Sequence, residues 1–458
     1  MSVLAIELND AGIVTATTAG WREEGPGYAL LDPEGLLLGE EARSQARLRP
    51  RRVNTRYWAQ LDTEALPRPE AYARSHADLA CAQLAAIWQA RPGGAKQALF
   101  VVPACMPRDA LGLLLGIAAE LEIPVAGMVD SAVAASTARA PGRTIVHLDV
   151  HLHAAMLTRI EQGADLERGE IALLPAAGVQ ALEDAWAARV AGAFVGQTRF
   201  DPLHSAAAEQ ALHNALREWL AALGPEDEVR AELDLQGRPL AARLDPSLVM
   251  EAAAEPYRGL ASRIEGWRRP GAPVLLQLTR RAAALPGLAR FLEALPGIEV
   301  RPLPAEAPAR GALARLDAFA PGEGGAVRFV TRLPPLETLE APGAPAAPAG
   351  RPDDPGRPTH LLLGGEAVPV GTGGRVVGLA PPGERPSLAL PGPAGGVSRV
   401  HFSLQLVDGR VVLEDHSRYG TFVNEARVDG RVALAAGDRV RVGAPGIVLQ
   451  AIRVREAS

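Results

Sequence analysis

Hydrophobic and polar residues follow two alternating periods along the first three quarters of the chain. Short apolar runs such as VLAIEL, QALFVVPA and RTIVHLDVHLHAAMLTRI are typical of strands. Between them, SHADLACAQLAAIWQA, RDALGLLLGIAAELE and VQALEDAWAARVAGAFVG repeat apolar residues at the spacing of a helix face. This alternation predicts an α/β fold in which helices cover the sheets.

The last hundred or so residues have a different pattern. Residues 359–458 contain short strand-like runs separated by glycine-rich turns such as VDGR, and they lack a helical period. An all-β sandwich is therefore expected there. Residues 334–358 are rich in proline, alanine and glycine and predict an extended spacer, which leaves residues 1–333 as the α/β part. A weaker break is expected at 223–230.

Composition narrows the classes of function. Charged residues make up 22% of the chain and the net charge is −6, so there is no overall basic field to bind nucleic acid. No basic, apolar leader begins the chain and no uncharged apolar run reaches membrane-spanning length, so neither export nor a membrane span is expected. Cys81 and Cys105 lack metal-ligand spacing and are expected to be packed, reduced thiols, which favours a cytoplasmic protein. The heavy use of Ala, Arg, Gly and Pro is typical of GC-rich bacteria.

Four short blocks near the C-terminus occur in a specific order. They are GL at 378–379, SRVH at 398–401, SRYGTFVN at 417–424 and LAAGDRVRVG at 434–443. In order and spacing this segment resembles the forkhead-associated (FHA) domain, a β-sandwich that reads phosphothreonine. The resemblance implies a protein partner, and in its usual form a phosphothreonine-containing one.

The resemblance also assigns roles to particular residues. The residues expected to contact a phosphopeptide are Ser398, Arg399, Ser417, Arg418 and Tyr419. The residues expected to brace the loops are Gly378, His401, Gly420, Thr421 and Asn424.

Two polar contacts of the FHA family are missing, because Leu379 replaces an arginine and Tyr419 an asparagine. Arg418, Arg375 and Arg385 are the residues that could replace the lost charge. Either a phosphopeptide reader or a phosphate-independent docking module is compatible with these changes.

The α/β part contains five segments in the order of another family. LAIELNDAG, LFVVPACMPRDALGLLLGIAAELEIPVAGMVDSAVAAS, TIVHLDVHLHAAMLTRI, EVRAELDLQGRPLAARLDPSLVMEAAAEPYRGLASRIEGW and APVLLQLTRRAAALPGLARFLEAL follow one another along the chain. Together they resemble the nucleotide-binding domain of heat-shock-70 (DnaK-type) chaperones. This resemblance implies a two-lobed actin-like ATPase fold built of ribonuclease H-like subdomains, with Mg-ATP held between two phosphate-binding hairpins.

The residues that would hold a nucleotide depart from that pattern. The family's glycines, threonines and serines let the backbone and hydroxyls approach the phosphates. Here the positions of the nucleotide contacts are occupied by Glu7, Asn9, Asp10, Asp149, His151, His153, Arg280 and Arg281. Only Asp149 matches the family, and an added carboxylate would repel a triphosphate. We therefore expect a pseudo-ATPase without catalytic residues and without a resident cofactor. The alternative is an ATP-binding switch that uses Arg280 or Arg281.

Two other patterns leave alternatives open. HLDVHLH places His147, Asp149, His151 and His153 on one face of a strand, which would suit a transition metal and hydrolysis. Residues two apart in a strand are about 6–7 Å apart, so a polar hairpin end is the favoured interpretation and no metal is expected. The basic segment RLRPRRVNTRYW at 47–58 is either a binding patch or a solvated loop.

Taken together, the sequence predicts a non-catalytic scaffold or regulatory adaptor. A pseudo-ATPase, chaperone-like domain would be joined to an FHA-like protein-interaction module. The ATP switch and metal-dependent hydrolysis are the competing hypotheses.

Overall fold

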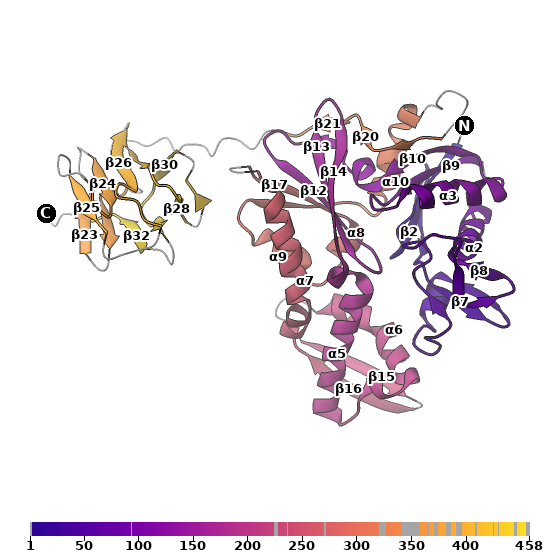
Figure 1. The fold of residues 1–458 in the computed structure, drawn as a ribbon. Helices are drawn as coiled ribbons and strands as arrows, with labels where there is room; N and C mark the ends of the chain where they lie inside the picture. Colours follow the sequence, from indigo (N-terminus) through magenta and orange to yellow (C-terminus); the bar gives the residue numbers. More distant parts are fainter. Residues whose placement is uncertain are drawn as a thin grey trace. The chain divides into compact units, whose positions relative to one another are not determined.

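The computed structural model divides into two compact units, residues 1–341 and residues 342–458 (Figure 1). The described residues are 2–92, 94–223, 228–235, 237–269, 272–319, 327–340, 357–363, 366–370, 374–381, 386–390, 396–407, 410–424, 426–428, 430–443 and 447–454. Each unit is described by itself below.

The first unit begins with a six-stranded sheet in the order β19-β10-β9-β1-β2-β3. Its strands are β1 (Ser2–Glu7), β2 (Ile13–Ala16), β3 (Trp21–Gly25), β9 (Ala95–Val102), β10 (Val125–Asp130) and β19 (Phe329–Val330). The first three strands pair antiparallel, whereas β9 pairs parallel with both β1 and β10. Helices α2 (His76–Gln89) and α3 (Arg108–Glu120) bury their apolar faces against β1 and β9.

A second six-stranded sheet has the order β18-β17-β12-β13-β14-β20. Its strands are β12 (Thr144–Val150), β13 (Ala155–Gln162), β14 (Leu166–Leu174), β17 (Val274–Leu278), β18 (Ile298–Pro302) and β20 (Arg332–Leu333). Here too the first three strands pair antiparallel, while β17 pairs parallel with β12 and β18. The two sheets therefore repeat one topology, and β12 is the counterpart of β1.

Two short helices of small residues pack between the sheets. Helices α4 (Ser131–Ala135) and α10 (Ala307–Leu313) share one buried cluster with residues of both sheets. A Cβ on Gly311 of α10 would lie 1.9 Å from the carbonyl oxygen of Ala134, so only glycine permits this approach. The close packing fixes the position of one sheet relative to the other and brings the β1–β2 turn to the β12–β13 turn.

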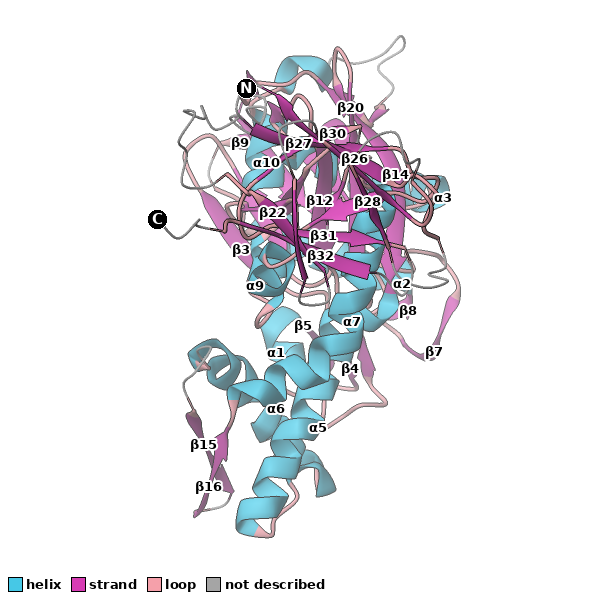
Figure 2. Ribbon diagram, turned by 90° about the vertical axis from the view of Figure 1, so that its left-hand side faces the viewer, coloured by secondary structure: helices cyan, strands magenta, loops and turns pink. Residues whose placement is uncertain are grey.

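The second sheet carries a helical extension. It consists of α5 (Val179–Thr198), α6 (Ala206–Ala222), α7 (Pro246–Trp267), α8 (Arg280–Ala283), α9 (Leu288–Glu293) and the hairpin β15 (Val229–Leu235) and β16 (Arg238–Leu244). Both views place α5, α6 and the hairpin together at one end of the unit (Figures 1 and 2). The helices and strands predicted from the six quoted runs are present. Residues 224–227, within the weaker predicted break, lie outside the described residues.

The basic segment at 47–58 is partly packed and partly exposed: Tyr57 and Trp58 are buried, whereas residues 48–51 and Arg56 are at the surface. It follows β4 (Ala29–Asp32), β5 (Gly35–Leu38) and α1 (Gly39–Arg43), and includes β6 (Val53–Asn54). Tyr57 and Trp58 are buried and both donate hydrogen bonds to Gln83, at 2.7 and 2.6 Å. Arg47 pairs with Asp184 of α5 and Glu209 of α6. Acids distant in sequence neutralise this arginine, which the local pattern could not indicate.

The two cysteines are both free, but they differ in exposure. Cys81 is half-buried and packs against the core of the first sheet. Cys105 is exposed, which corrects the expectation of a packed thiol. It lies in the turn between β9 and α3, outside the buried clusters of the first unit. No helix among the described residues has both the length and the apolarity to cross a membrane.

The second unit is all-β and consists of two sheets, in the orders β23-β22-β32-β31-β28-β29 and β25-β24-β26-β27-β30. The first sheet is formed by β22 (His360–Leu363), β23 (Glu366–Pro369), β28 (Thr421–Val423), β29 (Ala426–Arg427), β31 (Arg439–Val442) and β32 (Ile447–Ile452). The second is formed by β24 (Arg375–Gly378), β25 (Ser387–Ala389), β26 (Phe402–Val407), β27 (Arg410–Asp415) and β30 (Arg431–Leu434). Apolar side chains from both sheets form one core, as expected for a sandwich.

The predicted spacer at 334–358 is described only at its two ends. Near its start, β21 (Glu337–Thr338) pairs with β11 (Ala138–Arg139) of the first unit. Residues 341–356 lie outside the described residues.

Candidate functional site

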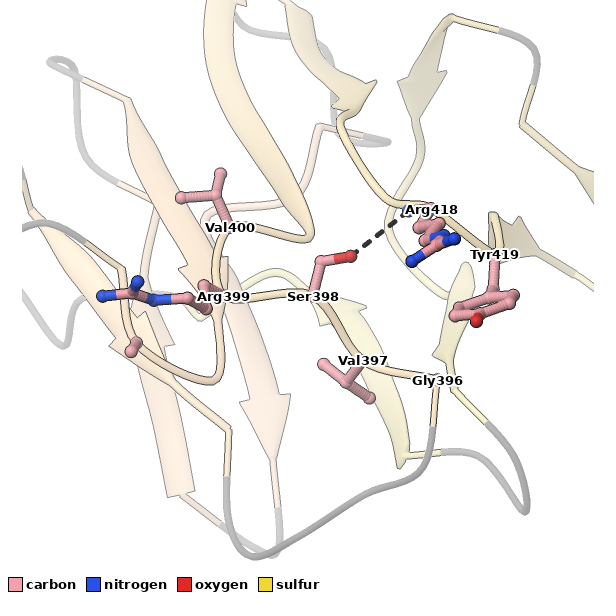
Figure 3. Close-up of a pocket in the computed structure, with 8 residues that line it drawn as sticks. Gly396, Val397, Ser398, Arg399, Val400, Arg418 and Tyr419 are labelled. Carbon is pink, nitrogen blue, oxygen red and sulfur yellow. Dashed lines mark hydrogen bonds between the residues drawn. The ribbon is translucent and has the colours of Figure 1, made fainter.

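A surface hollow of about 780 Å³ opens between two loops of the β-sandwich. Residues 396–400, between β25 and β26, form one side, and Arg418 and Tyr419, between β27 and β28, form the other. Figure 3 shows the Ser398 hydroxyl pointing toward Arg418 across this hollow. The arrangement joins two of the sequence blocks that were singled out.

Hydrogen bonds hold the Ser398 loop in place. The Ser398 amide donates to Nδ1 of His401 at 3.0 Å, and the Ser398 hydroxyl accepts from the Arg418 amide at 3.2 Å. His401 is buried, and burial lowers the pKa of its imidazole, so the ring stays neutral and Nδ1 can accept. The loop also lies directly on β24, because a Cβ on Gly378 would be 2.2 Å from the carbonyl oxygen of Arg399.

The second loop is fixed by an aspartate that sequence reasoning missed. Asp415 accepts hydrogen bonds from the Thr421 hydroxyl at 2.7 Å and the Ser417 amide at 3.0 Å. Although burial acts to raise the pKa of Asp415, these hydrogen bonds lower it overall. The Ser417 hydroxyl accepts from the amide of Gly420 at 2.8 Å, so Ser417 closes the turn and is not part of the lining. The one available signal was the position of Asp415 directly before the HSRYGT block.

The arginines around the hollow have different roles. Arg418 is exposed, and its guanidinium carbon lies 5.8 Å from the ring centre of Tyr419, which is itself 63% exposed. The Arg399 side chain also borders the hollow but extends away from the Ser398 hydroxyl (Figure 3). Arg375 donates to the carbonyls of Pro369 and Ser387 at 2.6 and 2.9 Å, so it is used within the sandwich.

The remaining predicted residues of the FHA module are Arg385 and Asn424. Arg385 lies outside the described residues. Asn424 adopts a left-handed conformation with φ 49° and bonds to Asp438 and to the Arg439 amide, at 2.8 and 2.9 Å. Asn424 therefore orders the β28 end of the sandwich and does not face the hollow.

The candidate nucleotide residues of the first unit meet where the two sheets meet. Asp149, at the end of β12, is 1% exposed. It accepts hydrogen bonds from the side-chain amide of Asn9 at 2.9 Å and from the Thr279 hydroxyl at 2.6 Å. The guanidinium of Arg281 donates to both Asp149 oxygens, at 3.2 and 3.1 Å. The β1–β2 turn, the β12–β13 turn and α8 therefore converge on one carboxylate.

Arg281 also bridges to the first sheet. It pairs with Glu7, the last residue of β1, and donates to the carbonyl of Gly12 at 3.1 Å. Burial raises the pKa of Glu7 to about 7, and the nearby guanidinium opposes this only in part. Burial also acts to raise the pKa of Asp149, but the bidentate Arg281 contact outweighs it and the net shift is downward. Asp149 is therefore a permanent anion held against a buried cation.

The two turns also touch each other directly. Asp10 accepts a hydrogen bond from the Leu152 amide at 2.8 Å and pairs with His151 at 3.3 Å. We call the group Glu7, Asn9, Asp10, Asp149, His151, Thr279 and Arg281 the hairpin junction. The side-chain amide of Asn9 also donates a hydrogen bond to the carbonyl of Val150, at 3.2 Å. Side chains thus join the β1–β2 turn directly to the β12–β13 turn.

The four polar residues of HLDVHLH do not converge. His147 is buried within β12, and burial lowers its pKa to about 4. Asp149 and His151 belong to the hairpin junction, whereas Nε2 of His153 turns to the carbonyl of Thr55 at 2.9 Å. Among the residues that the structure describes, no three His, Cys, Asp or Glu side chains are placed to hold a metal ion.

Arg280 differs from its neighbour. It is exposed, lies 6.0 Å from the ring centre of Trp21 and has Glu23 at 3.9 Å. Arg280 and Arg281 therefore have separate environments, one at the surface and one in the hairpin junction.

Comparison with known families identifies one domain. The FHA domain family matches residues 374–443, which confirms the resemblance inferred for the C-terminal part. An FHA domain is a phosphopeptide-binding, protein-interaction module, so the second unit is assigned to that class. The match does not reach residues 1–341, and comparison with curated proteins found no match.

Proposed function

We propose that this chain is a non-catalytic adaptor in which an FHA module binds a phosphothreonine-containing protein and the first unit is a pseudo-ATPase scaffold. The observation that carries the first half is the pairing of Ser398 and Arg418 across an open hollow in the matched domain. The observation that carries the second half is the Arg281 guanidinium between Glu7 and Asp149.

In the FHA module, the phosphate is proposed to contact Ser398 and Arg418. Arg418 is exposed, so its guanidinium can rotate toward a phosphate and form a bidentate, charge-assisted contact. It takes over the role of the arginine that Leu379 replaces, since Leu379 packs against the core of the sandwich. Tyr419 supplies an exposed aromatic surface beside the phosphate position for a neighbouring peptide side chain.

For the first unit we propose the two-lobed actin-like fold that the sequence resemblance implies. The repeated topology of its two sheets supports this proposal, because each begins with three antiparallel strands and continues with two parallel ones. The equivalent turns of the two sheets face each other, and the hairpin junction fills the space between them.

A buried cation at this junction argues against the ATP switch. For a triphosphate to enter, Arg281 would have to leave two buried carboxylates, and breaking such a contact costs about 3–5 kcal/mol. The phosphates would then face the carboxylates of Asp10 and Asp149, whose negative charges repel them. Arg281 is therefore proposed as an internal substitute for the cationic side of a nucleotide complex.

Two binding experiments on the full chain test the proposal. A degenerate phosphothreonine peptide library should be retained by the wild type, and at least tenfold less by Ser398→Ala and by Arg418→Ala. Arg431→Ala is the matched control, because Arg431 is an exposed arginine on β30 that pairs with Glu414 and does not line the hollow. Equal retention of phosphorylated and unphosphorylated peptides would exclude the reader.

The second experiment is a calorimetric titration of the full chain with Mg-ATP. No saturable binding is expected for the wild type. A dissociation constant tighter than about 100 μM, which corresponds to roughly −5.5 kcal/mol, would refute the pseudo-ATPase assignment and restore the switch.

A further inference from the structure

A second cavity, of about 450 Å³, lies in the first unit beside the hairpin junction. It is bordered by the loop at 56–62, the β9–α3 segment at 103–110 and the β12–β13 turn at 151–154. Asp10 and His151 line this cavity and also belong to the hairpin junction. A cavity of this size lies within the range of small-molecule sites.

The walls of the cavity are mainly apolar. Trp58, Leu61, Met106 and Ala110 present buried apolar side chains, and Leu173 at the rim is 50% exposed. A half-exposed leucine side chain becomes buried when an apolar molecule covers it, which favours binding by about 25 cal/mol for each Å² covered. The lining therefore favours an occupant with an apolar body.

Each of the two carboxylates in the lining contacts a histidine, and neither forms an ion pair with Arg56, the one guanidinium of the lining. Of the two carboxylates, Asp10 is paired with His151 at 3.3 Å, and Asp62 is paired with His76 at 3.1 Å. The His153 ring is held by the carbonyl of Thr55. Arg56 is exposed and forms no ion pair with any acid in the described part of the chain. One guanidinium is thus left at the mouth of an apolar cavity without a counter-charge.

We propose that this cavity binds a small amphipathic anion, an aromatic or aliphatic carboxylate whose apolar body lies against Trp58 and Met106 and whose carboxylate pairs with Arg56. A volume of about 450 Å³ lies within the range of small-molecule sites and suits a bicyclic acid. This site does not depend on the phosphopeptide proposal, because it lies in the other unit.

The test is calorimetric titration of the full-length protein with 2-naphthoate and with 2-naphthol, which has the same rings without the carboxylate. Saturable one-to-one binding of 2-naphthoate is expected, with 2-naphthol at least tenfold weaker. Arg56→Gln should weaken 2-naphthoate at least tenfold, a change of about 1.4 kcal/mol, and leave 2-naphthol unchanged. Arg51→Gln is the matched control, because Arg51 is exposed in the same basic segment and does not line the cavity.

A second variant blocks the cavity without touching the core. Ala59 lines the cavity but is exposed, so Ala59→Trp should fill the mouth, abolish binding of both compounds and leave the thermal unfolding temperature within a few degrees. Absence of saturable binding of 2-naphthoate at 2 mM, equal binding of 2-naphthol, or binding that survives Ala59→Trp would each overturn the proposal. Competition of 2-naphthoate by Mg-ATP would also overturn it, because the occupant would then be a nucleotide.

Discussion

Replacing Arg281 with glutamine should destabilise the first unit far more than its exposure suggests. The side chain is 16% exposed and is the cationic partner of Glu7 and Asp149, which are each about 1% exposed. Removing one member of a buried ion pair leaves an uncompensated charge and costs about 3–5 kcal/mol. We expect the free energy of unfolding to fall by that amount.

The assay is urea unfolding of the full chain followed by tryptophan fluorescence. All six tryptophans lie between residues 21 and 267, so the signal reports on the first unit alone. Arg280→Gln is the matched control, because Arg280 is the adjacent residue and is 59% exposed. An exposed substitution of this kind should change the free energy of unfolding by less than about 0.5 kcal/mol.

The pH dependence adds a signature that a general loss of packing would not produce. Burial already raises the pKa of Glu7 to about 7, and without the opposing guanidinium that pKa rises further above its unfolded value, while the pKa of Asp149 also moves upward. A group with a raised folded pKa loses its contribution as pH rises, so Arg281→Gln should be less destabilised at pH 5 than at pH 8. Adding Glu7→Gln to Arg281→Gln should recover part of the loss, because one of the two unpaired carboxylates is removed.

Three results would refute this reasoning. One is a decrease of less than about 1 kcal/mol in the free energy of unfolding for Arg281→Gln, which would indicate a solvated guanidinium. Another is a loss equal to that of Arg280→Gln. The third is a loss that does not change between pH 5 and pH 8.

Two further predictions concern packing and protonation. Gly311→Ala should lower the free energy of unfolding by about 3 kcal/mol or more in the same urea assay, because its Cβ would lie 1.9 Å from the Ala134 carbonyl oxygen. Gly112→Ala is the control: Gly112 is exposed in a helix with nothing within 4 Å, so this change should stabilise by about 0.5–1 kcal/mol. Similar effects for the two would disprove the close packing of α4 and α10. In the FHA module, the lowered pKa of His401 means that its contribution to stability is present above about pH 6.5, the unfolded value, and is lost as pH falls through the folded pKa. Protonation of Nδ1 would break the hydrogen bond from the Ser398 backbone amide. Hydrogen exchange of that amide, corrected for the intrinsic rate, should therefore be faster at pH 5 than at pH 7.5. Unchanged protection would contradict this account.

The sequence by itself determined the type of the six quoted runs and the presence of the FHA domain. Apolar spacing is a local property, so the runs at β1, β9 and α3 could be assigned without tertiary information. The FHA blocks are also local, and the family match at 374–443 agrees with them. Replacement of glycine and threonine by Asn9 and Asp10 was equally visible in the sequence.

Only the tertiary structure decided what those replacements do. Arg281 and Glu7 are 274 residues apart, and no periodicity relates them. The same holds for Arg47, whose charge is neutralised by acids of α5 and α6, and for Arg56, which stays unpaired a few residues later. The direction of a long, flexible side chain depends on which groups the folded chain brings within a few ångströms of it. The residue types are therefore encoded locally, whereas the pairing of charges and the position of the cavity follow from long-range packing.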